Sequence, residues 1–502
     1  MLNLAVRNTK KLVREKVKED NVRLGRFFTK KEQAALMASL PELPEKDVFR
    51  VLDPGAGTGI LSAAIVERLA AEGHVREIYL TCYETDPAYL PMLTDNLERI
   101  RKKCRHDYKV KLFPTVIEEN YLLSRKDALS PKLPEDTYGE FDIVIMNPPH
   151  DPIPTDCEEY RICRRLCSGE TDLGYLFAAA AVTDLVPGGE LVMMQPVVFS
   201  SAAYAEKLRR YLFSRTVLTK MHLFLNRTDS DRMLDGARKN MLLCLRRAQN
   251  APELVRISTS YGDTGEVHTV MRTDYATVVR GEEKSILLLK SAEEAKIVEI
   301  VSHFPCTLSS LGLRMRTGLT IESRYPALLR NEPEDGAVPL IHPNSIQLGQ
   351  IAFPRAGVKN QYLMAKVPSI LQFNKNMLFI KRIPAKSDKK ALFCGAYLAS
   401  QLPRFRYIST HNKLNYIDYA DDREMDFNMV YGLFVVLNSS LYGKYYQVVS
   451  KSKQINATEF AELPLPSALA LRAMGAKLAM SRVFSEKACD NILLGQMRSG
   501  KL

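Results

Sequence analysis

Apolar residues in the first half of the chain form short β-rich runs that alternate with helix-like stretches. The run at 49–52 leads into a Gly-rich turn, and Ile60 to Ala71 then has the apolar spacing of an amphipathic helix that ends at Gly73. Three further β-rich runs lie at 78–83, 141–146 and 190–194. This alternation predicts a mostly parallel sheet with helices on both faces, whose ligands bind at the carboxyl ends of the strands.

The alternation weakens after about residue 250, where Pro and Gly punctuate many short segments that mix basic, aromatic and Asn/Gln residues. A length of 502 residues also exceeds the usual size of a single hydrophobic core. We therefore expect an α/β domain at 1–250 and an α+β domain at 251–466. The Ala- and Leu-rich stretch at 467–502 is expected to form helix that packs back on the body.

The composition is that of a globular protein, with 46% hydrophobic and 25% charged residues. No window approaches the roughly 20 apolar residues of a membrane span, and the charged N-terminus lacks an apolar signal core. These features predict a cytoplasmic protein without a membrane partner. The formal net charge of +12 favours a polyanionic partner, although charge alone is weak evidence.

The nine cysteines are odd in number and scattered along the chain, which suggests reduced thiols. Cys157, Cys163 and Cys167 form the densest group, but they lack the close Cys-x-x-Cys spacing of common zinc sites. We interpret them as structural thiols and predict no metal site.

A glycine loop follows the first β-rich run at Asp53-Pro54-Gly55-Ala56-Gly57-Thr58-Gly59. Between a strand and a helix, such a loop lets a ligand approach the backbone closely. Glu84 ends the next strand, where a carboxylate can accept hydrogen bonds from both ribose hydroxyls of a nucleoside. A dinucleotide such as NAD or FAD is the competing interpretation, but the loop lacks the G-x-G-x-x-G spacing. The alternative without a ligand is a tight turn beside a solvated acid.

The β-rich run at 141–146 ends directly at Asn147-Pro148-Pro149-His150. Two prolines remove two backbone donors and hold the chain in an extended turn, while the carbonyls remain available. The Asn147 side-chain oxygen and the Pro148 carbonyl can accept both hydrogens of an exocyclic base amine and make its nitrogen more nucleophilic. His150 can stack on a base or serve as a hydrogen-bonding loop histidine.

Together these motifs resemble the gamma-class, TaqI-like N6-adenine DNA methyltransferases of restriction–modification systems, closest to the PstI/BsuBI group. Gly25-Arg26-Phe27-Phe28-Thr29 is similar to the family's N-terminal cofactor motif, and Asn120-Tyr121-Leu122 lies where the family usually has Asp-Phe-Leu. The resemblance implies the class I fold of methyltransferases that use S-adenosylmethionine. It implies cofactor-binding roles for Phe28, Thr29, Asp53, Gly55, Gly57, Gly59, Glu84, Asn120 and Tyr121, and catalytic roles for Asn147, Pro148, Pro149 and His150.

The resemblance further implies methylation of N6 of a flipped-out adenine in double-stranded DNA, by a monomer, with a separate cognate restriction endonuclease as a candidate partner. Two positions depart from the family pattern. His150 replaces an aromatic residue, and the later motif with a second stacking aromatic falls near 234–240, where no aromatic occurs. Since the family has an aromatic residue at position 150, we expect His150→Tyr to preserve or raise activity.

The C-terminal part resembles the family's target-recognition domain at Thr317-Gly318-Leu319, at 375–382 and at 454–456. Its basic residues can neutralise phosphates, while Asn and Gln can contact base edges. Each single residue is more often a solvated surface residue. The candidates for DNA binding are Arg314, Arg316, Lys359, Lys381, Arg382, Lys413 and Lys453.

Three alternatives remain open at this point. Protein glutamine methyltransferases use the same turn chemistry, and an rRNA or tRNA target is compatible with the basic C-terminal half. The departures from the family pattern also allow a catalytically silent DNA-binding protein. A C5-cytosine enzyme needs a Pro-Cys nucleophile, and Pro305-Cys306 lies outside the predicted catalytic sheet.

Overall fold

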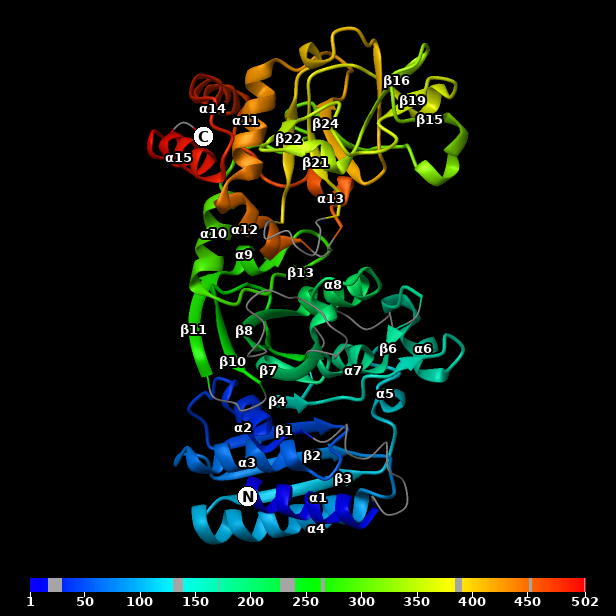
Figure 1. The fold of residues 1–502 in the computed structure, drawn as a ribbon. Helices are drawn as coiled ribbons and strands as arrows, with labels where there is room; N and C mark the ends of the chain where they lie inside the picture. The colour runs from blue at the N-terminus through cyan, green and yellow to red at the C-terminus, as the bar shows by residue number, and fades with distance from the viewer. Residues whose placement is uncertain are drawn as a thin grey trace. The chain divides into compact units, whose positions relative to one another are not determined.

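The computed structural model divides the chain into two compact units, unit 1 at Met1–Ala292 and unit 2 at Glu293–Leu502 (Figure 1). It describes residues 1–16, 29–129, 139–169, 171–225, 240–262, 267–383, 391–450, 454–500 and 502. Within these ranges no helix is both long and apolar enough to cross a membrane.

Unit 1 is built on a nine-stranded sheet with the order β11-β10-β8-β9-β7-β4-β1-β2-β3. Its strands are β1 (Val48–Pro54), β2 (Glu77–Tyr83), β3 (Lys111–Ile117), β4 (Phe141–Met146), β7 (Leu185–Pro196), β8 (Thr216–Leu225), β9 (Asn240–Arg247), β10 (Leu254–Tyr261) and β11 (Val267–Asp274). Neighbours from β3 to β7 pair in parallel, whereas β9 runs antiparallel to both β7 and β8. The predicted mostly parallel α/β sheet is confirmed.

The main helices of unit 1 are α1 (Leu2–Lys16), α2 (Lys31–Ser39), α3 (Ile60–Ala71), α4 (Leu90–Lys103), α5 (Tyr121–Ser124), α6 (Glu158–Cys163), α7 (Leu173–Ala181), α8 (Glu206–Arg215) and α9 (Tyr275–Val278). Buried side chains of α1 to α4 share one core with the inner faces of β1 to β4, which fixes the carboxyl ends of these strands in place. Two small strand pairs, β5 (Pro152–Ile153) with β6 (Thr171–Asp172) and β12 (Val279–Arg280) with β13 (Ser285–Ile286), complete the unit.

Unit 2 contains two sheets, ordered β14-β24-β21-β22-β18-β17 and β15-β19-β16-β23-β20. Their strands are β14 (Leu313–Thr317), β15 (Leu329–Arg330), β16 (Ala337–Ile341), β17 (Ile346–Gln347), β18 (Gln350–Ile351), β19 (Tyr362–Met364), β20 (Leu371–Phe373), β21 (Met377–Lys381), β22 (Cys394–Tyr397), β23 (Tyr407–Thr410) and β24 (Leu414–Tyr419). Its helices are α10 (Ala292–Ser302, which crosses the unit boundary), α11 (Phe427–Asn438), α12 (Ser440–Val449), α13 (Ala457–Ala461), α14 (Ala468–Ser481) and α15 (Glu486–Arg498). An α+β architecture after the parallel sheet is therefore present.

The domain boundaries differ from those expected at 250 and 466. The antiparallel pair of β10 and β11 continues the sheet of unit 1 through hydrogen bonds to β8, so the first unit extends to Ala292. At the other end, α14 packs on α11, where Gly432 and Gly475 allow close backbone approach. Residues 467–502 are thus part of unit 2 and form two helices, separated at Arg482, which has a left-handed backbone with φ 54°.

Candidate active site

The glycine loop joins β1 to α3 at the carboxyl edge of the unit 1 sheet. Gly55, Gly57 and Gly59 all have positive φ, at 75°, 56° and 81°, a conformation that favours residues without a Cβ. The amides of Gly55 and Ala56 donate to the carbonyl of Tyr83, at the end of β2. These bonds hold the loop open at the edge where strands β1 and β2 end together.

Glu84 follows β2 and fastens the same loop. Its Oε2 accepts from the amide of Gly57 at 2.7 Å, while Oε1 accepts from the amides of Thr85 and Asp86, both at 2.8 Å. Each carboxylate oxygen can accept more than one hydrogen bond. The predicted ribose-binding acid therefore lies directly against the glycine loop, with its orientation fixed by three backbone amides.

Asp53 is 1% exposed at the end of β1. Its Oδ2 accepts from the hydroxyl of Ser62 at 2.6 Å, and its Oδ1 is buried without a hydrogen-bond partner in the described residues. Burial raises the pKa of this carboxyl to about 7, and the nearby Glu84 carboxylate adds to the rise. A buried acceptor without a partner beside a glycine loop is a candidate ligand contact.

A polar cluster behind the glycine loop was not predicted from the sequence. The hydroxyls of Thr9 and Thr58 lie 2.7 Å apart, and the side-chain nitrogen of Asn96 donates to the Thr58 carbonyl. Asn8 in turn donates to Asn96. These residues come from α1, the loop and α4, so their convergence depends on helix packing that no local motif reveals.

An aromatic cluster lies at the next strand ends. Tyr121, 2% exposed, contacts the rings of Tyr83 and Phe177, with centroids 5.2 and 5.4 Å away. A Cβ on Gly55 would lie 3.7 Å from the ring of Phe177, so α7 approaches the glycine loop. Asn120 caps α5 through Oδ1, and its Nδ2 donates to Glu159. The predicted cofactor-binding positions Asn120 and Tyr121 are thus near the loop, and Phe177 is a further member of the cluster that the sequence did not single out.

A buried ion pair supports this aromatic cluster. Arg125 bonds Asp184 at 2.8 Å, and the hydroxyl of Tyr121 donates to the same carboxylate at 2.7 Å. The guanidinium also lies over the rings of Tyr83 and Tyr121. Burial raises the pKa of Tyr121 well above its ordinary value, with the Asp184 charge acting in the same direction, so the phenol stays protonated and remains a donor.

The Asn-Pro-Pro turn begins where β4 ends. Because Val51 and Leu52 pair in parallel with Ile143 and Val144, the carboxyl end of β4 lies beside the carboxyl end of β1 and the glycine loop. The side-chain nitrogen of Asn147 donates to the hydroxyl of Thr29 at 3.0 Å. Thr29 is buried, and its contact is made through the Asn147 nitrogen, so the amide oxygen remains available to accept. The structure thereby brings together one residue of the N-terminal motif and one of the Asn-Pro-Pro turn.

His150 is held by the protein on two sides. Its Nδ1 lies 3.1 Å from Oδ1 of Asp172, its Nε2 lies 3.2 Å from the carbonyl of Met194, and its side chain is 12% exposed. This geometry is that of a hydrogen-bonding loop histidine. A role in base stacking stays a prediction.

Several predicted positions lie outside the described residues. They are Phe28, the 234–239 part of the later motif, and Lys453. The described end of that motif, Asn240, begins β9 opposite Pro196 of β7.

In unit 2, Arg314 and Arg316 lie on β14 and share the buried carboxylate of Asp418 on the paired strand β24. Arg314 bonds Asp418 at 3.2 Å and Asp422 at 2.6 Å, and Arg316 also forms an ion pair with Asp418. Asp418 is 4% exposed, and Arg316 covers the ring of Tyr416. Both arginines have a structural partner, and their DNA contacts remain a prediction.

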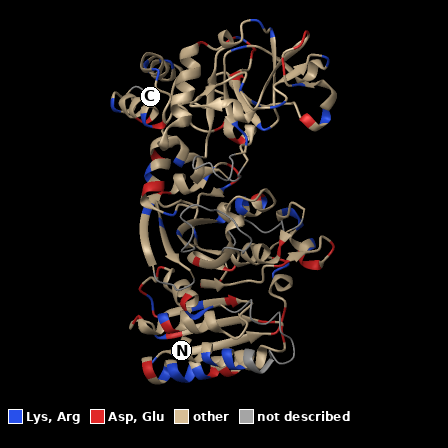
Figure 2. Ribbon diagram, in the orientation of Figure 1, with Lys and Arg blue, Asp and Glu red and all other residues tan. Residues whose placement is uncertain are grey.

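The other basic candidates of unit 2 differ in environment. Arg382 lies against the amide of Gln454, and its backbone bonds Lys413 and Ile455, so the structure joins two segments that resemble the recognition domain. Lys381 lies over the ring of Phe393. Lys359 and Lys413 have exposed side chains. In Figure 2 the Lys and Arg positions drawn for unit 2 lie among Asp and Glu positions.

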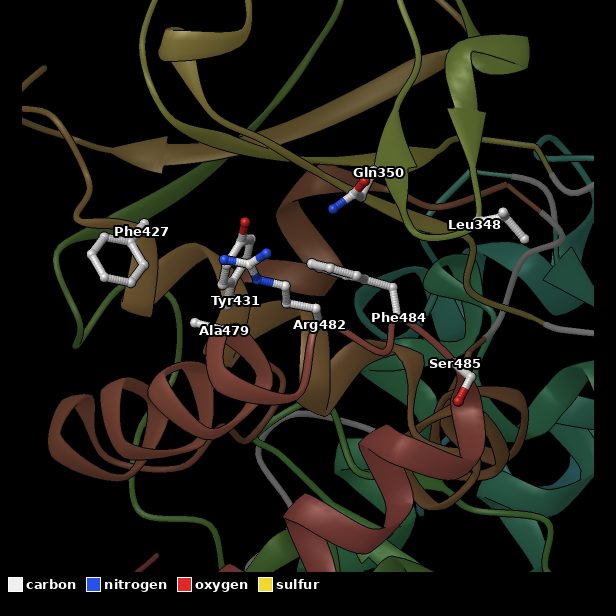
Figure 3. A pocket seen from close by; sticks show the side chains of 8 residues that line it. All are labelled: Leu348, Gln350, Phe427, Tyr431, Ala479, Arg482, Phe484 and Ser485. Atoms are coloured by element: carbon white, nitrogen blue, oxygen red, sulfur yellow. The ribbon is translucent and has the colours of Figure 1, made fainter.

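A pocket of about 660 Å³ opens in unit 2 between α11, the end of α14 and the β17–β18 turn. Figure 3 shows the rings of Phe427, Tyr431 and Phe484 with Arg482 around it. The remaining lining residues are Leu348, Gln350, Ala479 and Ser485. None of them belongs to the motifs that the sequence singled out.

One group in the described ranges places three potential metal ligands close together, namely Glu322, His342 and His411. His342 Nε2 bonds the carbonyl of Asn360, and His411 Nδ1 accepts from the amide of Lys413. A metal-bound imidazole usually donates its second N–H to an acceptor, which the Lys413 amide prevents. We therefore interpret these three residues as part of a hydrogen-bonded core and not as a metal site.

The three clustered cysteines have structural contacts. Cys157 caps α6 by accepting from the amide of Tyr160, and the thiol of Cys167 bonds the carbonyl of Cys163. Burial raises the pKa of Cys163 to about 12 and that of Cys167 to about 11, so both thiols stay protonated at neutral pH. Cys306 belongs to unit 2, where its backbone forms an isolated antiparallel β-bridge with Leu465.

Comparison with known proteins places these features in context. Residues 67–229 match the model of the Eco57I restriction-modification methylase. The chain is 25% identical to the Type II methyltransferase M.PstI of Providencia stuartii over 450 residues, which cover 89% of this chain and 87% of that protein. It is also 25% identical to the Type II methyltransferase M.BsuBI of Bacillus subtilis over 455 residues, covering 90% and 89%. The predicted resemblance to the PstI/BsuBI group is confirmed.

A solved structure, that of the type IIG restriction endonuclease BpuSI, aligns with 97% of this chain and 67% of its own, at 12% identity and a TM-score of 0.45. In this chain, the strand order with the antiparallel β9 inserted between β7 and β8 is that of class I methyltransferases that use S-adenosylmethionine. The predicted fold class is confirmed.

Proposed function

We propose that this chain, which resembles Type II methyltransferases over nine-tenths of its length, is a site-specific DNA methyltransferase of a restriction–modification system. Its proposed reaction transfers a methyl group from S-adenosylmethionine to N6 of an adenine flipped out of double-stranded DNA. The observation that carries the proposal is the Asn147-Pro148 turn at the end of β4, beside the glycine loop and with the Asn147 amide held by Thr29.

The residues at the carboxyl edge fit S-adenosylmethionine. The loop offers three glycines with positive φ, Glu84 is fixed against the loop, and Asp53 has a buried oxygen that bonds to none of the described residues. We assign the nucleoside to Glu84, Asn120 and Tyr121, and the methionine end to Asp53 and the segment that contains Phe28 and Thr29. When bound, the cofactor supplies a methyl group on a sulfonium, which a nitrogen nucleophile can attack directly.

The Asn147-Pro148 turn suits an exocyclic amine. Its two hydrogens need two acceptors, which the Asn147 side-chain oxygen and the Pro148 carbonyl supply. The Asn147 nitrogen donates to the hydroxyl of Thr29, which leaves the amide oxygen available to accept. Flipping the base out of the duplex costs a few kcal/mol, which contacts in the pocket partly recover. No covalent enzyme intermediate is required.

We assign target recognition to unit 2 and duplex DNA as its partner. Lys359 and Lys413 are the exposed cations of the candidate set, while Arg382 holds Gln454 and Ile455 in place. The chain is proposed to act as a monomer in the cytoplasm. A separate endonuclease that cuts the same sequence is the candidate partner in the cell.

The test is transfer of label from S-adenosylmethionine into unmethylated genomic DNA, followed by long-read sequencing for modified bases. We expect N6-methyladenine at one short sequence, and a loss of about 10²–10³-fold on Asn147→Ala, comparable to the loss of one preorganised hydrogen-bond group in other enzymes. Asn250→Ala, at an exposed position in unit 1, is the matched control and should retain full activity.

The same assay separates the alternatives. Label in rRNA, tRNA or protein, with none in DNA, would contradict a DNA target. Label on cytosine would contradict adenine specificity alone. Tight DNA binding without transfer to any substrate would indicate a silent DNA-binding protein.

A further inference from the structure

The segment that follows the Asn-Pro-Pro turn is hydrogen-bonded to the start of α7. The amide of Leu173 donates to the carbonyl of Asp151 at 2.9 Å, and Pro152 and Ile153 pair with Asp172 and Thr171. Asp172 also caps α7, since its Oδ1 accepts from the amide of Gly174 at 2.9 Å. His150 lies between this segment and the two prolines.

The ring of His150 packs directly on Gly174. A Cβ at this glycine would lie 2.5 Å from Nδ1 and 2.6 Å from Cε1 of His150, and 3.1 Å from Cγ of Pro148. Glycine in a helix is less favourable than alanine by roughly 1 kcal/mol. Here its missing side chain makes room for the imidazole and for the proline of the catalytic turn.

Both ring nitrogens of His150 face protein acceptors. Nδ1 lies near Asp172, which caps α7, and Nε2 lies near the carbonyl of Met194 in β7. The side-chain nitrogen of Gln195 in the same strand donates to the carbonyl of Gly174 at 3.2 Å. The imidazole therefore connects the catalytic turn with α7 and β7, and little of its surface remains for a substrate.

From this geometry we propose that His150 is a positioning residue, which locks the Pro148-Pro149 backbone against Asp172, Gly174 and Met194, and that it does not stack on the target base. The inference rests on the proposed methyl transfer, because the backbone it fixes carries the Pro148 acceptor. It reverses the expectation for His150→Tyr, since a phenol ring can neither fit over Gly174 as the imidazole does nor bond Asp172 and Met194 together.

The first test compares His150→Gln with His150→Phe. An amide keeps a nitrogen that can donate to Asp172 or Met194 but has no ring, whereas phenylalanine keeps the ring without nitrogen. A displaced acceptor can cost about 10²-fold in rate, so we expect that loss in single-turnover methylation for His150→Phe and His150→Tyr. For His150→Gln we expect a loss within about tenfold, with KM for DNA unchanged in all three. Full activity of His150→Phe, together with a raised KM for DNA in His150→Gln, would overturn the proposal in favour of stacking.

The second test is Gly174→Ala, which favours helix but displaces His150. We expect a fall in methylation rate without a fall in melting temperature, while Gly443→Ala in α12, where a Cβ would meet nothing within 4 Å, leaves both unchanged. Wild-type rates in Gly174→Ala would overturn the proposal.

A third measurement does not depend on methyl transfer. Hydrogen exchange at the amides of His150 and Asp151 should be faster in His150→Phe than in the wild-type protein, and close to wild type in His150→Gln. If the hydrogen exchange of these amides were unchanged in His150→Phe, the positioning role of His150 would be contradicted, even in an active enzyme. Failure of the proposed function would instead appear as an inactive wild-type protein with the expected exchange pattern.

Discussion

Two buried aspartates, one in each unit, have opposite surroundings. Asp53 in unit 1 is 1% exposed and bonds a serine hydroxyl, while its second oxygen has no partner among the described residues. Asp418 in unit 2 is 4% exposed and bonds two arginines, Arg314 and Arg316. A buried charge is costly unless it is paired. Asp418 meets that requirement within the fold, whereas Asp53 does not.

This difference between the two aspartates indicates which of them lies at a site suited to bind a ligand. Strongly shifted carboxyl groups gather at functional sites, where burial without a partner is tolerated because a substrate or cofactor completes the site. Asp53 lies beside the glycine loop and has its pKa raised to about 7 by burial. Asp418 and its arginines instead hold β24 to β14. We therefore propose a ligand-binding role for Asp53 and a structural role for Asp418.

The largest expected effect comes from Asp53→Asn. The pKa of Asp53 is about 7 in the fold and 3.8 as its ordinary value, so between these values the folded state binds the extra proton. Stability of the wild-type protein should therefore fall as pH rises from about 4 to about 7, by up to about 1.4 kcal/mol per pH unit from this group. Asp53→Asn should lack this slope while binding S-adenosylmethionine roughly 10- to 100-fold more weakly.

Urea unfolding between pH 5 and 8 and calorimetric cofactor binding measure both effects. Asp418→Asn is the matched control, and it should lower stability at neutral pH while leaving cofactor affinity unchanged. A stability difference between Asp53→Asn and the wild-type protein that does not vary with pH would show that Asp53 is ionised in the fold throughout.

The sequence predicted the edge of unit 1 well because parallel strands end at a common edge. The glycine loop, Glu84 and the Asn-Pro-Pro turn all follow predicted strands, so their convergence required only the strand order. The helix at 60–71 and the strand at 141–146 occur in the structure with the predicted bounds. By contrast, Thr9, Asn96 and Phe177 reach the loop from helices, and a helix position does not by itself indicate which loop it contacts.

A second expected effect tests the paired aspartate. Arg316→Ala removes one partner of Asp418, and leaving a buried acceptor incompletely satisfied costs about 1–3 kcal/mol. Because Arg316 is 38% exposed, solvent screening places the expected loss toward the lower end of that range. Thermal unfolding should show it as a lower melting temperature, and Arg314→Ala should act similarly. If Arg316→Ala left stability unchanged and weakened DNA binding, Arg316 would be assigned to the DNA interface.

The sequence predicted the environments of the basic residues in unit 2 less well than it predicted the strand ends in unit 1. The strands of unit 2 are short and its sheets mixed, so a basic residue can face a neighbouring carboxylate or solvent with no change in the local pattern. Arg314 and Lys413 belonged to one candidate set, yet one is in an ion-pair network and the other is exposed. The expected domain boundary was too early for a related reason, since β10 pairs in parallel with β8 and β11 pairs antiparallel with β10 after the βα alternation has ended.

A third expected effect concerns the loop beside Asp53. Gly59 has φ 81° and a Cβ there would lie 2.9 Å from Cδ1 of Leu93, whereas Gly73 has φ 70° with nothing within 4 Å. Alanine in the left-handed region costs roughly 1–2 kcal/mol at either position. We expect both variants to lose similar stability, and Gly59→Ala alone to weaken cofactor binding, by about tenfold. Equal cofactor affinity in the two variants would argue that the loop backbone does not approach the ligand.

The smallest expected effect belongs to Lys359 and Lys413, two exposed lysines of unit 2 that form no ion pair within the described ranges. Lys359→Ala and Lys413→Ala should leave the melting temperature unchanged. If each lysine neutralises one phosphate, DNA affinity should fall uniformly across sequences and the slope of log K against log salt should decrease by about 1. Titrations of labelled duplex at several salt concentrations measure this slope. A slope identical to that of the wild-type protein in the double variant would remove both lysines from the DNA interface and leave Lys381 and Arg382 as the candidates nearest to the Gln454 segment.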